Sequence, residues 1–289
     1  MMPETRKGRA LFAPLAAMLA IAHPAFPAAA ASMPRRVVSM NLCTDQMAML
    51  VAEPGQLHSV SFLAADPVSS VMAPQAGRYA VNHGQAEEIF LMQPDLVLAG
   101  TYTAGATVDL LRRLGIRVEQ FAPENSFDDI RASLRRMGDV LGQPQRAEQL
   151  IADLDGRLAA VKVGDHAGMT AAIYYANNYT SGSGTLIDDV MTKAGLVNIA
   201  TKFGFAGMER LPLELLVLSD PDLLVTADRN YSAPALAQQG FEHPAFRAQA
   251  ALSGAVDIAS RYTICGAPFT VEAVRLLSQG ADARKASPK

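Results

Sequence analysis

One internal repeat constrains the fold of this chain more than any other feature. Residues 87–98 read EEIFLMQPDLVL, and residues 214–225 read ELLVLSDPDLLV. Each segment has a Glu, six further residues, Pro-Asp-Leu and then a short aliphatic run. Proline disfavours helical geometry in the residue before it, and unbroken aliphatic runs are typical of strands covered on both faces of a parallel sheet. Each segment therefore predicts a short helix, a turn and a buried strand, and the repeat predicts two α/β lobes of related plan.

The rest of the apolar pattern agrees with two parallel sheets joined by a helix. Further strands are predicted at 36–40, 58–62, 116–121, 170–175 and 255–259. Apolar residues recur at helical spacing between 145 and 163, which predicts one long helix between the halves. The expected fold class is α/β, with two Rossmann-like lobes whose parallel sheets are joined by one long interlobe helix. The expected bounds are 35–142 for the N-terminal lobe, 143–164 for the helix and 168–281 for the C-terminal lobe.

The first thirty or so residues have the pattern of an export signal. Basic residues between positions 6 and 9 precede the apolar run 10–22, and the small-residue stretch 28–32 follows. This order is typical of a secretory signal peptide, here covering 1–31 with cleavage near Ala31. The apolar run is shorter than the roughly 20 residues that a membrane span requires. We expect a protein exported to the periplasm.

Composition and motifs exclude several classes of function. There are 25 Lys and Arg against 28 Asp and Glu, which argues against a dedicated nucleic-acid binder. The sequence has no nucleophile-elbow motif, no His-Glu-x-x-His, no phosphate loop and no dinucleotide-binding glycine pattern. With 5 His in all, a cluster for a bare metal ion is not expected. We expect a binding protein rather than an enzyme, with no catalytic residues and no resident cofactor or metal.

The chain resembles the substrate-binding proteins of ABC importers for ferric siderophores, haem and cobalamin. The resemblance rests on the strand 36–40, the two repeated blocks, the segment 114–118 and the helix in mid-chain. It implies a class III periplasmic binding protein, in which cargo lies between two lobes that move little about the connecting helix. It also implies that one Glu on each lobe meets arginines of the membrane permease, and the matching residues are Glu87 and Glu214. The alternative for each is a solvated carboxylate favoured by the positive end of a helix.

Loops at the carboxyl ends of the predicted strands supply the candidate ligand-binding residues, because ligands of parallel α/β lobes bind there. These residues are aromatic, amide-bearing and cationic, and an Arg can grip paired oxygens of carboxylate, catecholate or hydroxamate groups. The candidates are Asn41, Cys43, Arg78, His83, Tyr102, Tyr179, Arg229, Tyr231, Arg261, Tyr262 and Cys265.

The expected cargo is a metal chelate, with a ferric siderophore first and cobalamin or another corrinoid second. Proteins of this family often bind corrinoids through the indole ring of Trp, and this sequence has no Trp. Haem remains open through His83 or a tyrosine. The expected partners are this chelate and an ABC permease of the inner membrane, with the chain itself a monomer. The alternative is a periplasmic chelate sensor, or a haem or metal-ion binding protein of the same fold.

The two cysteines leave three readings open. Cys43 follows the first predicted strand and Cys265 follows the last. A disulfide is the default for two cysteines in an oxidising compartment, and it would join the two lobes. The other readings are free thiols that contact the metal of the cargo, and small buried apolar side chains.

Overall fold

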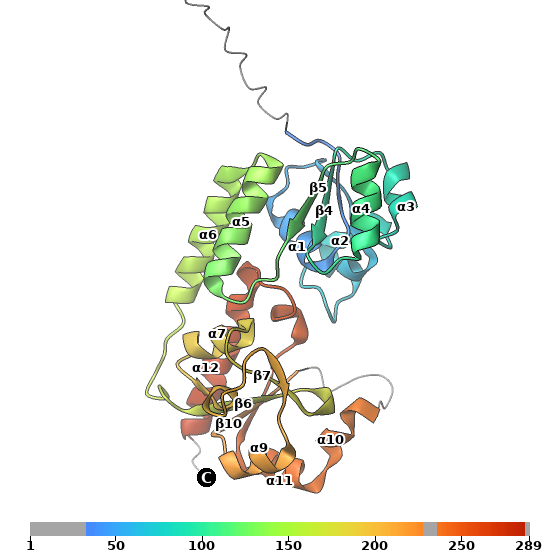
Figure 1. Cartoon of the computed structure of the whole chain (residues 1–289). Coiled ribbons are helices and arrows are strands. Elements are labelled where there is room, and N and C mark those ends of the chain that lie inside the picture. The colour runs from blue at the N-terminus through green and yellow to red at the C-terminus, as the bar shows by residue number, and fades with distance from the viewer. Residues whose placement is uncertain (1–32, 228–235, 287–289) are drawn as a thin grey trace, which may run out of the picture. The chain divides into compact units, whose positions relative to one another are not determined.

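Two parallel sheets organise residues 33–227 and 236–286, which are the residues that the computed structural model describes (Figure 1). The first sheet has the strand order β3-β2-β1-β4-β5, and the second has the order β11-β10-β6-β8. The strands of the first are β1 (Val37–Ser39), β2 (Leu57–Ser61), β3 (Ala80–Asn82), β4 (Leu96–Gly100) and β5 (Val118–Phe121). Those of the second are β6 (Thr170–Tyr174), β8 (Val197–Asn198), β10 (Leu223–Thr226) and β11 (Gly254–Asp257). An antiparallel pair is formed by β7 (Tyr179–Ser181) and β9 (Met208–Arg210).

Helices alternate with these strands, as the predicted α/β class requires. In the first half they are α1 (Leu42–Val51), α2 (Ala73–Ala76), α3 (Ala86–Leu91), α4 (Gly105–Arg113) and α5 (Phe127–Leu141). They continue with α6 (Pro144–Ala159), α7 (Leu186–Lys193), α8 (Ile199–Lys202), α9 (Leu213–Ser219), α10 (Gln239–Glu242), α11 (Pro244–Leu252) and α12 (Val271–Ala286). The predicted fold class is confirmed. Over the described ranges, none of these helices has the length and apolar character needed to cross a bilayer.

The sequence repeat is also a repeat of structure. Read from its other edge, the first sheet runs β5-β4-β1-β2-β3, and the second runs β11-β10-β6-β8, so the first four strands of one correspond to the four of the other. The helix-turn-strand units α3–β4 and α9–β10 therefore occupy the same place in each sheet. The registers agree as well, because β4 begins opposite Val37 of β1 and β10 begins opposite Ala171 of β6.

The repeated Asp holds the neighbouring strand in position. The Asp95 carboxylate accepts hydrogen bonds from the backbone N–H groups of Arg35 and Arg36, at 2.6 and 3.0 Å. The Asp222 carboxylate accepts hydrogen bonds from the backbone N–H and the hydroxyl of Thr170, both at 2.8 Å. In the first half the carboxylate binds the two residues before β1, and in the second half it binds Thr170, the first residue of β6. This shared role explains why both blocks contain Pro-Asp.

In each block the residue before the proline lies just after the short helix and has a left-handed backbone conformation. Gln93 has φ 51° before Pro94, and Asp220 has φ 39° before Pro221. A proline cannot follow a regular helical residue without a clash, so the chain turns at this point. The turn sends the backbone from the short helix directly into the buried strand.

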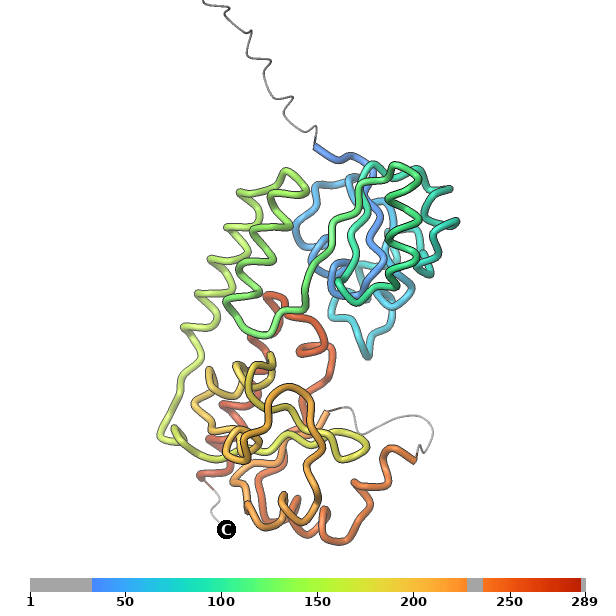
Figure 2. The backbone as a smooth tube through the Cα atoms, in the orientation of Figure 1, coloured from blue at the N-terminus to red at the C-terminus, as the bar shows by residue number. Residues whose placement is uncertain are grey.

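The predicted interlobe helix is present as α6, but it ends at Ala159 rather than at 164. Beyond it the chain leaves helical geometry, and Val163 packs against Gly195 so closely that a Cβ on Gly195 would lie 2.4 Å from it. Figure 2 shows α6 running beside α5, and the two helices are in contact. Gly138 of α5 permits this approach, since a Cβ there would lie 2.6 Å from the Ala147 Cβ.

One apolar cluster extends through both sheets and the helices between them. Its buried members include Leu98, Leu134, Leu154, Met191, Val225 and Leu277, from β4, α5, α6, α7, β10 and α12. The chain from Met33 onward accordingly forms one compact unit, and the lobe bounds 35–142 and 168–281 stay predictions. The predicted signal peptide, 1–31, lies outside the described residues.

We expect Asp222→Ala to lower the free energy of unfolding by about 1–3 kcal/mol, because two donors of Thr170 lose a charged acceptor. Chemical denaturation followed by circular dichroism measures this change. Asp109→Ala is the matched control, since Asp109 is an exposed residue of α4, and its effect should stay within about 0.5 kcal/mol. Equal effects of the two substitutions would contradict the assigned role of Asp222.

Candidate functional site

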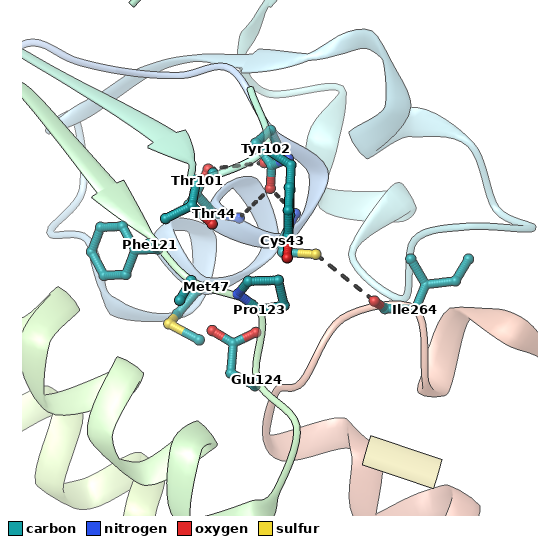
Figure 3. A pocket seen from close by; sticks show the side chains of 12 residues that line it. Cys43, Thr44, Met47, Thr101, Tyr102, Phe121, Pro123, Glu124 and Ile264 are labelled. Atoms are coloured by element: carbon teal, nitrogen blue, oxygen red, sulfur yellow. Dashed lines mark hydrogen bonds between the residues drawn. The ribbon is translucent and has the colours of Figure 1, made fainter. Parts of the chain in front are cut away.

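A cavity of about 180 Å³ lies at the carboxyl ends of the central strands of the first sheet (Figure 3). Three stretches of chain form it: the start of α1 after β1, the end of β4 and the end of β5. Ile264, from the segment between β11 and α12 in the other half, completes the lining. The lining residues are Asn41, Cys43, Thr44, Met47, Gly100, Thr101, Tyr102, Phe121, Ala122, Pro123, Glu124 and Ile264. This is the place where parallel sheets bind ligands.

The first turn of α1 is fixed by its cap. Asn41 is the N-cap residue, and its side-chain oxygen accepts hydrogen bonds from the backbone N–H groups of Cys43 and Thr44. The Thr44 hydroxyl lies 2.8 Å from that of Ser39 at the end of β1. Gly100 leaves room for the cap, since a Cβ there would lie 3.1 Å from the Asn41 amide nitrogen. These contacts hold Cys43 at the edge of the cavity.

A buried carboxyl group ties α1 to β2. Asp45 is fully buried and accepts hydrogen bonds from the backbone N–H and the hydroxyl of Ser61, at 3.1 and 2.5 Å. Burial raises the pKa of Asp45 to about 7, against the opposing effect of the hydroxyl and N–H donors. The carboxyl group anchors the helix that forms one wall of the cavity.

The two cysteines form a disulfide between the halves of the chain. Cys43 and Cys265 are bonded, with 5.1 Å between their Cα atoms and a sequence separation of 222. The carbonyl oxygen of Ile264 lies 4.0 Å from the Cys43 sulfur (Figure 3). Of the three readings that the sequence left open, the structure contains the disulfide. The free-thiol reading would require metal contact by sulfurs that are already bonded to each other.

Noncovalent contacts hold the same segment to the first half. Ala267 and Phe269 are buried in one cluster with Met72, against which Met49 packs. The Arg261 guanidinium donates a hydrogen bond to the Pro67 carbonyl, at 3.2 Å. The segment 260–270 is thus a second connection between the halves, in addition to the α5–α6 pair.

Among the described residues that line the cavity, one side chain is acidic and none is basic. Glu124 is 6% exposed, and burial raises the pKa of its carboxyl group. Gly266 lets the segment approach this carboxyl, because a Cβ there would lie 2.4 Å from the Glu124 Cβ. Most of the other side chains in Figure 3 are apolar or hydroxyl-bearing. No group of three His, Cys, Asp or Glu that could hold a metal occurs within residues 33–227 and 236–286.

The structure brings three of the predicted ligand-binding residues into the cavity lining, and a fourth is bonded to one of them. Asn41, Cys43 and Tyr102 line it, and Tyr102 lies at its rim with 88% of its surface exposed. Cys265 is buried behind it in the disulfide. Arg229 and Tyr231 fall outside the described residues, so the structure says nothing about them.

The other predicted residues lie elsewhere. Arg78 is exposed, and the His83 ring stacks on Phe62 with its centroid 5.7 Å away. The Arg261 guanidinium carbon lies 5.3 Å from the centre of the Tyr262 ring. Neither residue lines the cavity.

Tyr179 belongs to a separate surface. It lies in β7, with the guanidinium of Arg210 5.4 Å from its ring centre. Arg210 also lines an open hollow of about 420 Å³ near Asn178 and His243. The described candidates therefore do not converge on a single site.

Several lining residues were missed by the sequence reasoning. They are Thr44, Met47, Thr101, Phe121, Pro123, Glu124 and Ile264. Glu124 follows the predicted strand 116–121, so its position at a strand end was an available signal. Met47, Phe121 and Ile264 resemble core residues in sequence, and no pattern distinguishes them.

Glu87 and Glu214 occupy equivalent positions outside the cavity. Each is the second residue of its helix, α3 or α9, and each is exposed. Neither forms a hydrogen bond or an ion pair with another residue in the described part of the chain. Glu88, by contrast, accepts a hydrogen bond from the His83 backbone N–H at 2.7 Å.

Sequence comparison matches residues 37–253 to the family described as periplasmic binding protein. A cobalamin-binding protein of Halobacterium salinarum is 30% identical over 211 residues, covering 68% of this chain and 56% of the relative. The chain thus spans about half the length of the curated relatives it matches first.

Two solved structures have the same fold. A periplasmic heme binding protein from Pseudomonas aeruginosa is 22% identical, with a TM-score of 0.68 over 89% of this chain and 94% of that chain. The periplasmic vitamin B12 binding protein of Vibrio cholerae is 17% identical, with a TM-score of 0.66 over 88% of this chain and 98% of that chain.

We expect the Cys43→Ser/Cys265→Ser double variant to unfold with a free energy lower by about 2–5 kcal/mol, since the disulfide closes a long loop. Thermal or chemical denaturation measures the loss, with the reduced wild-type protein as the control that should match the variant. Thiol titration of the denatured, unreduced protein should detect no free thiol. Detection of two thiols would contradict the disulfide.

Proposed function

This chain belongs to the periplasmic binding protein family, and on that premise we propose that it captures a metal chelate and delivers it to the permease of an ABC importer. The observation that carries the proposal is the cavity at the strand ends of one half, which a residue of the other half closes. Binding between two halves is the arrangement expected of a capture protein in this family. The chain acts as a binding component, with export to the periplasm through the segment 1–31.

The charge of the cavity favours a corrinoid as the cargo. Ferric catecholates and ferric citrate are anionic, and a buried site for them needs cationic partners. Among the described residues, the lining of the cavity offers Glu124 and no Lys, Arg or His. A corrinoid carries neutral amide side chains around a cobalt centre with positive charge, so a carboxyl group nearby is compatible with it. The name of the Halobacterium relative agrees with this choice.

Hydrogen-bond acceptors in the cavity suit amide donors. Glu124, Thr101 and Ile264 line the cavity, and the carboxyl, hydroxyl and carbonyl oxygens of these residues can accept hydrogen bonds (Figure 3). The N–H groups of corrinoid amides can donate to such oxygens. The exposed ring of Tyr102 provides an apolar face where an indole is absent.

The size of the cavity indicates how much of the cargo it holds. Its volume of about 180 Å³ is below the roughly 300–1,000 Å³ of typical ligand pockets. We propose that one edge of the chelate enters the cavity and that the rest lies over its rim. A ferric siderophore, the cargo expected first from the sequence, would use Arg78, Arg229 and Arg261 as cationic partners. Arg78 and Arg261 do not line the cavity, and Arg229 lies outside the described residues.

Delivery would use Glu87 and Glu214. Both are exposed carboxylates on matching helices, and neither has a charged partner among the described residues. Exposed charges of this kind steer encounter and set register with a cationic partner more than they add affinity. One such charge in each half suits a permease that contacts both.

Corrinoids should stabilise the protein against heat, whereas a ferric catecholate should not. A ligand at a hundredfold its Kd adds about 2.7 kcal/mol to the free energy of unfolding, which thermal denaturation detects. The panel is cobinamide, cobalamin, a ferric hydroxamate, a ferric catecholate and haemin, each added to the purified protein. Stabilisation by the catecholate or by haemin without a response to corrinoids would overturn the cargo assignment.

The same experiment locates the site. Ile264→Arg places a large cation at the opening, and it should weaken corrinoid binding by about a hundredfold or more, because the charge is buried when cargo binds. Leu252→Arg is the matched control, since Leu252 is a similarly exposed residue at the end of α11. Calorimetric titration measures both.

A further inference from the structure

The repeat exposes a leucine at the same position in both halves. Leu91 at the end of α3 and Leu218 near the end of α9 are each 79% exposed. The residues before them, Phe90 and Val217, are 45% and 39% exposed. Single exposed leucines are ordinary on protein surfaces. Matching exposure at equivalent positions of two repeats calls for a shared cause.

The packing of α3 and α9 against the apolar clusters beneath them does not explain why both leucines are exposed. Each helix faces its core through a different residue, Ile89 in α3 and Leu216 in α9, and both are fully buried. The apolar clusters beneath the helices contain these two residues, whereas Leu91 and Leu218 belong to neither cluster. The folded chain thus gains no burial from either exposed leucine.

The exposed leucines share a helix face with the two glutamates. Glu87 and Leu91 are four residues apart, as are Glu214 and Leu218, and this spacing places side chains next to each other on a helix. We name each of these combinations an acidic–apolar pair. Each half of the chain therefore presents one carboxylate beside one apolar side chain.

We propose that Leu91 and Leu218 are apolar anchors that the permease buries when its cations meet Glu87 and Glu214. This inference rests on the proposed function and adds a second chemical requirement to it. The permease must then present two equivalent sites, each with a cation beside an apolar pocket. A two-fold symmetric dimer does so, because its two subunits display the same surface.

The carboxylate and the leucine of an acidic–apolar pair affect different steps of binding to the permease. The carboxylates accelerate encounter and are screened by salt, whereas a buried apolar side chain slows dissociation. The neighbouring Glu88 is excluded from this role, because its carboxylate is bound to the backbone and ring of His83. Loss of Leu91 or Leu218 should therefore change the dissociation rate, and loss of the glutamates should change the association rate.

The test measures binding kinetics between the purified, cargo-loaded protein and the permease–ATPase complex of the corrinoid importer in nanodiscs. Leu91→Ala and Leu218→Ala should each raise the dissociation rate about tenfold, as truncated interface anchors do, and the double variant about a hundredfold. The association rate and its salt dependence should stay unchanged. Leu252→Ala is the control, since Leu252 is 54% exposed on a helix end without an adjacent repeated Glu.

The Glu87→Gln/Glu214→Gln double variant distinguishes the apolar-anchor proposal from the proposal that the glutamates dock to the permease. Leucine variants that dissociate like the wild type, beside a glutamine variant that binds poorly, would overturn the apolar anchors and leave permease docking intact. An effect of one leucine alone would overturn the two-fold arrangement. Normal binding by all of these variants would overturn docking itself. Unchanged cargo affinity and melting temperature confirm that each variant is folded.

Discussion

The Cys43–Cys265 bond is the constraint on which the proposed site depends. It joins the first turn of α1 to the segment 260–270, and thereby places Ile264 of one half over the strand ends of the other. The Asn41 cap and the buried Asp45 fix the helix side of this bond. Together with the shared core, the bond limits how far the halves can separate. The proposed binding site is therefore largely formed in advance, which lowers the ordering cost of binding.

The proposed function divides between two kinds of surface on this scaffold. The carboxyl ends of β1, β4 and β5 form the cavity, which is apolar, hydroxyl-bearing and weakly acidic. The helices α3 and α9 carry the acidic–apolar pairs, one in each half. Both surfaces derive from the same unit, because the turn that begins β4 or β10 also ends the helix before it. The Pro-Asp element sets this geometry through a left-handed residue and a carboxylate bound to the adjacent strand.

The α/β class and the repeat could be predicted because they depend on local patterns. The run after each Pro-Asp is aliphatic over its length, and such runs form buried parallel strands wherever they occur. The helix at α6 was predicted from its apolar spacing, although it ends at Ala159, and Val163 beyond it packs against Gly195. The cavity could be predicted only in part, because Ile264 and Cys265 meet Cys43 across more than two hundred residues of chain. The acidic side chain of the cavity was not predicted either, because the sequence does not show that Glu124 is buried in the lining.

Corrinoid uptake by cells tests the central claim, capture followed by delivery, most directly. The measurement compares cells that lack the chromosomal copy and express either the wild type or Glu87→Gln/Glu214→Gln, with labelled cobinamide as the substrate. The account predicts that the variant binds cobinamide with wild-type affinity and that uptake falls to the level of cells without the protein. Full uptake with the variant, or uptake that is independent of the wild-type protein, would contradict the account.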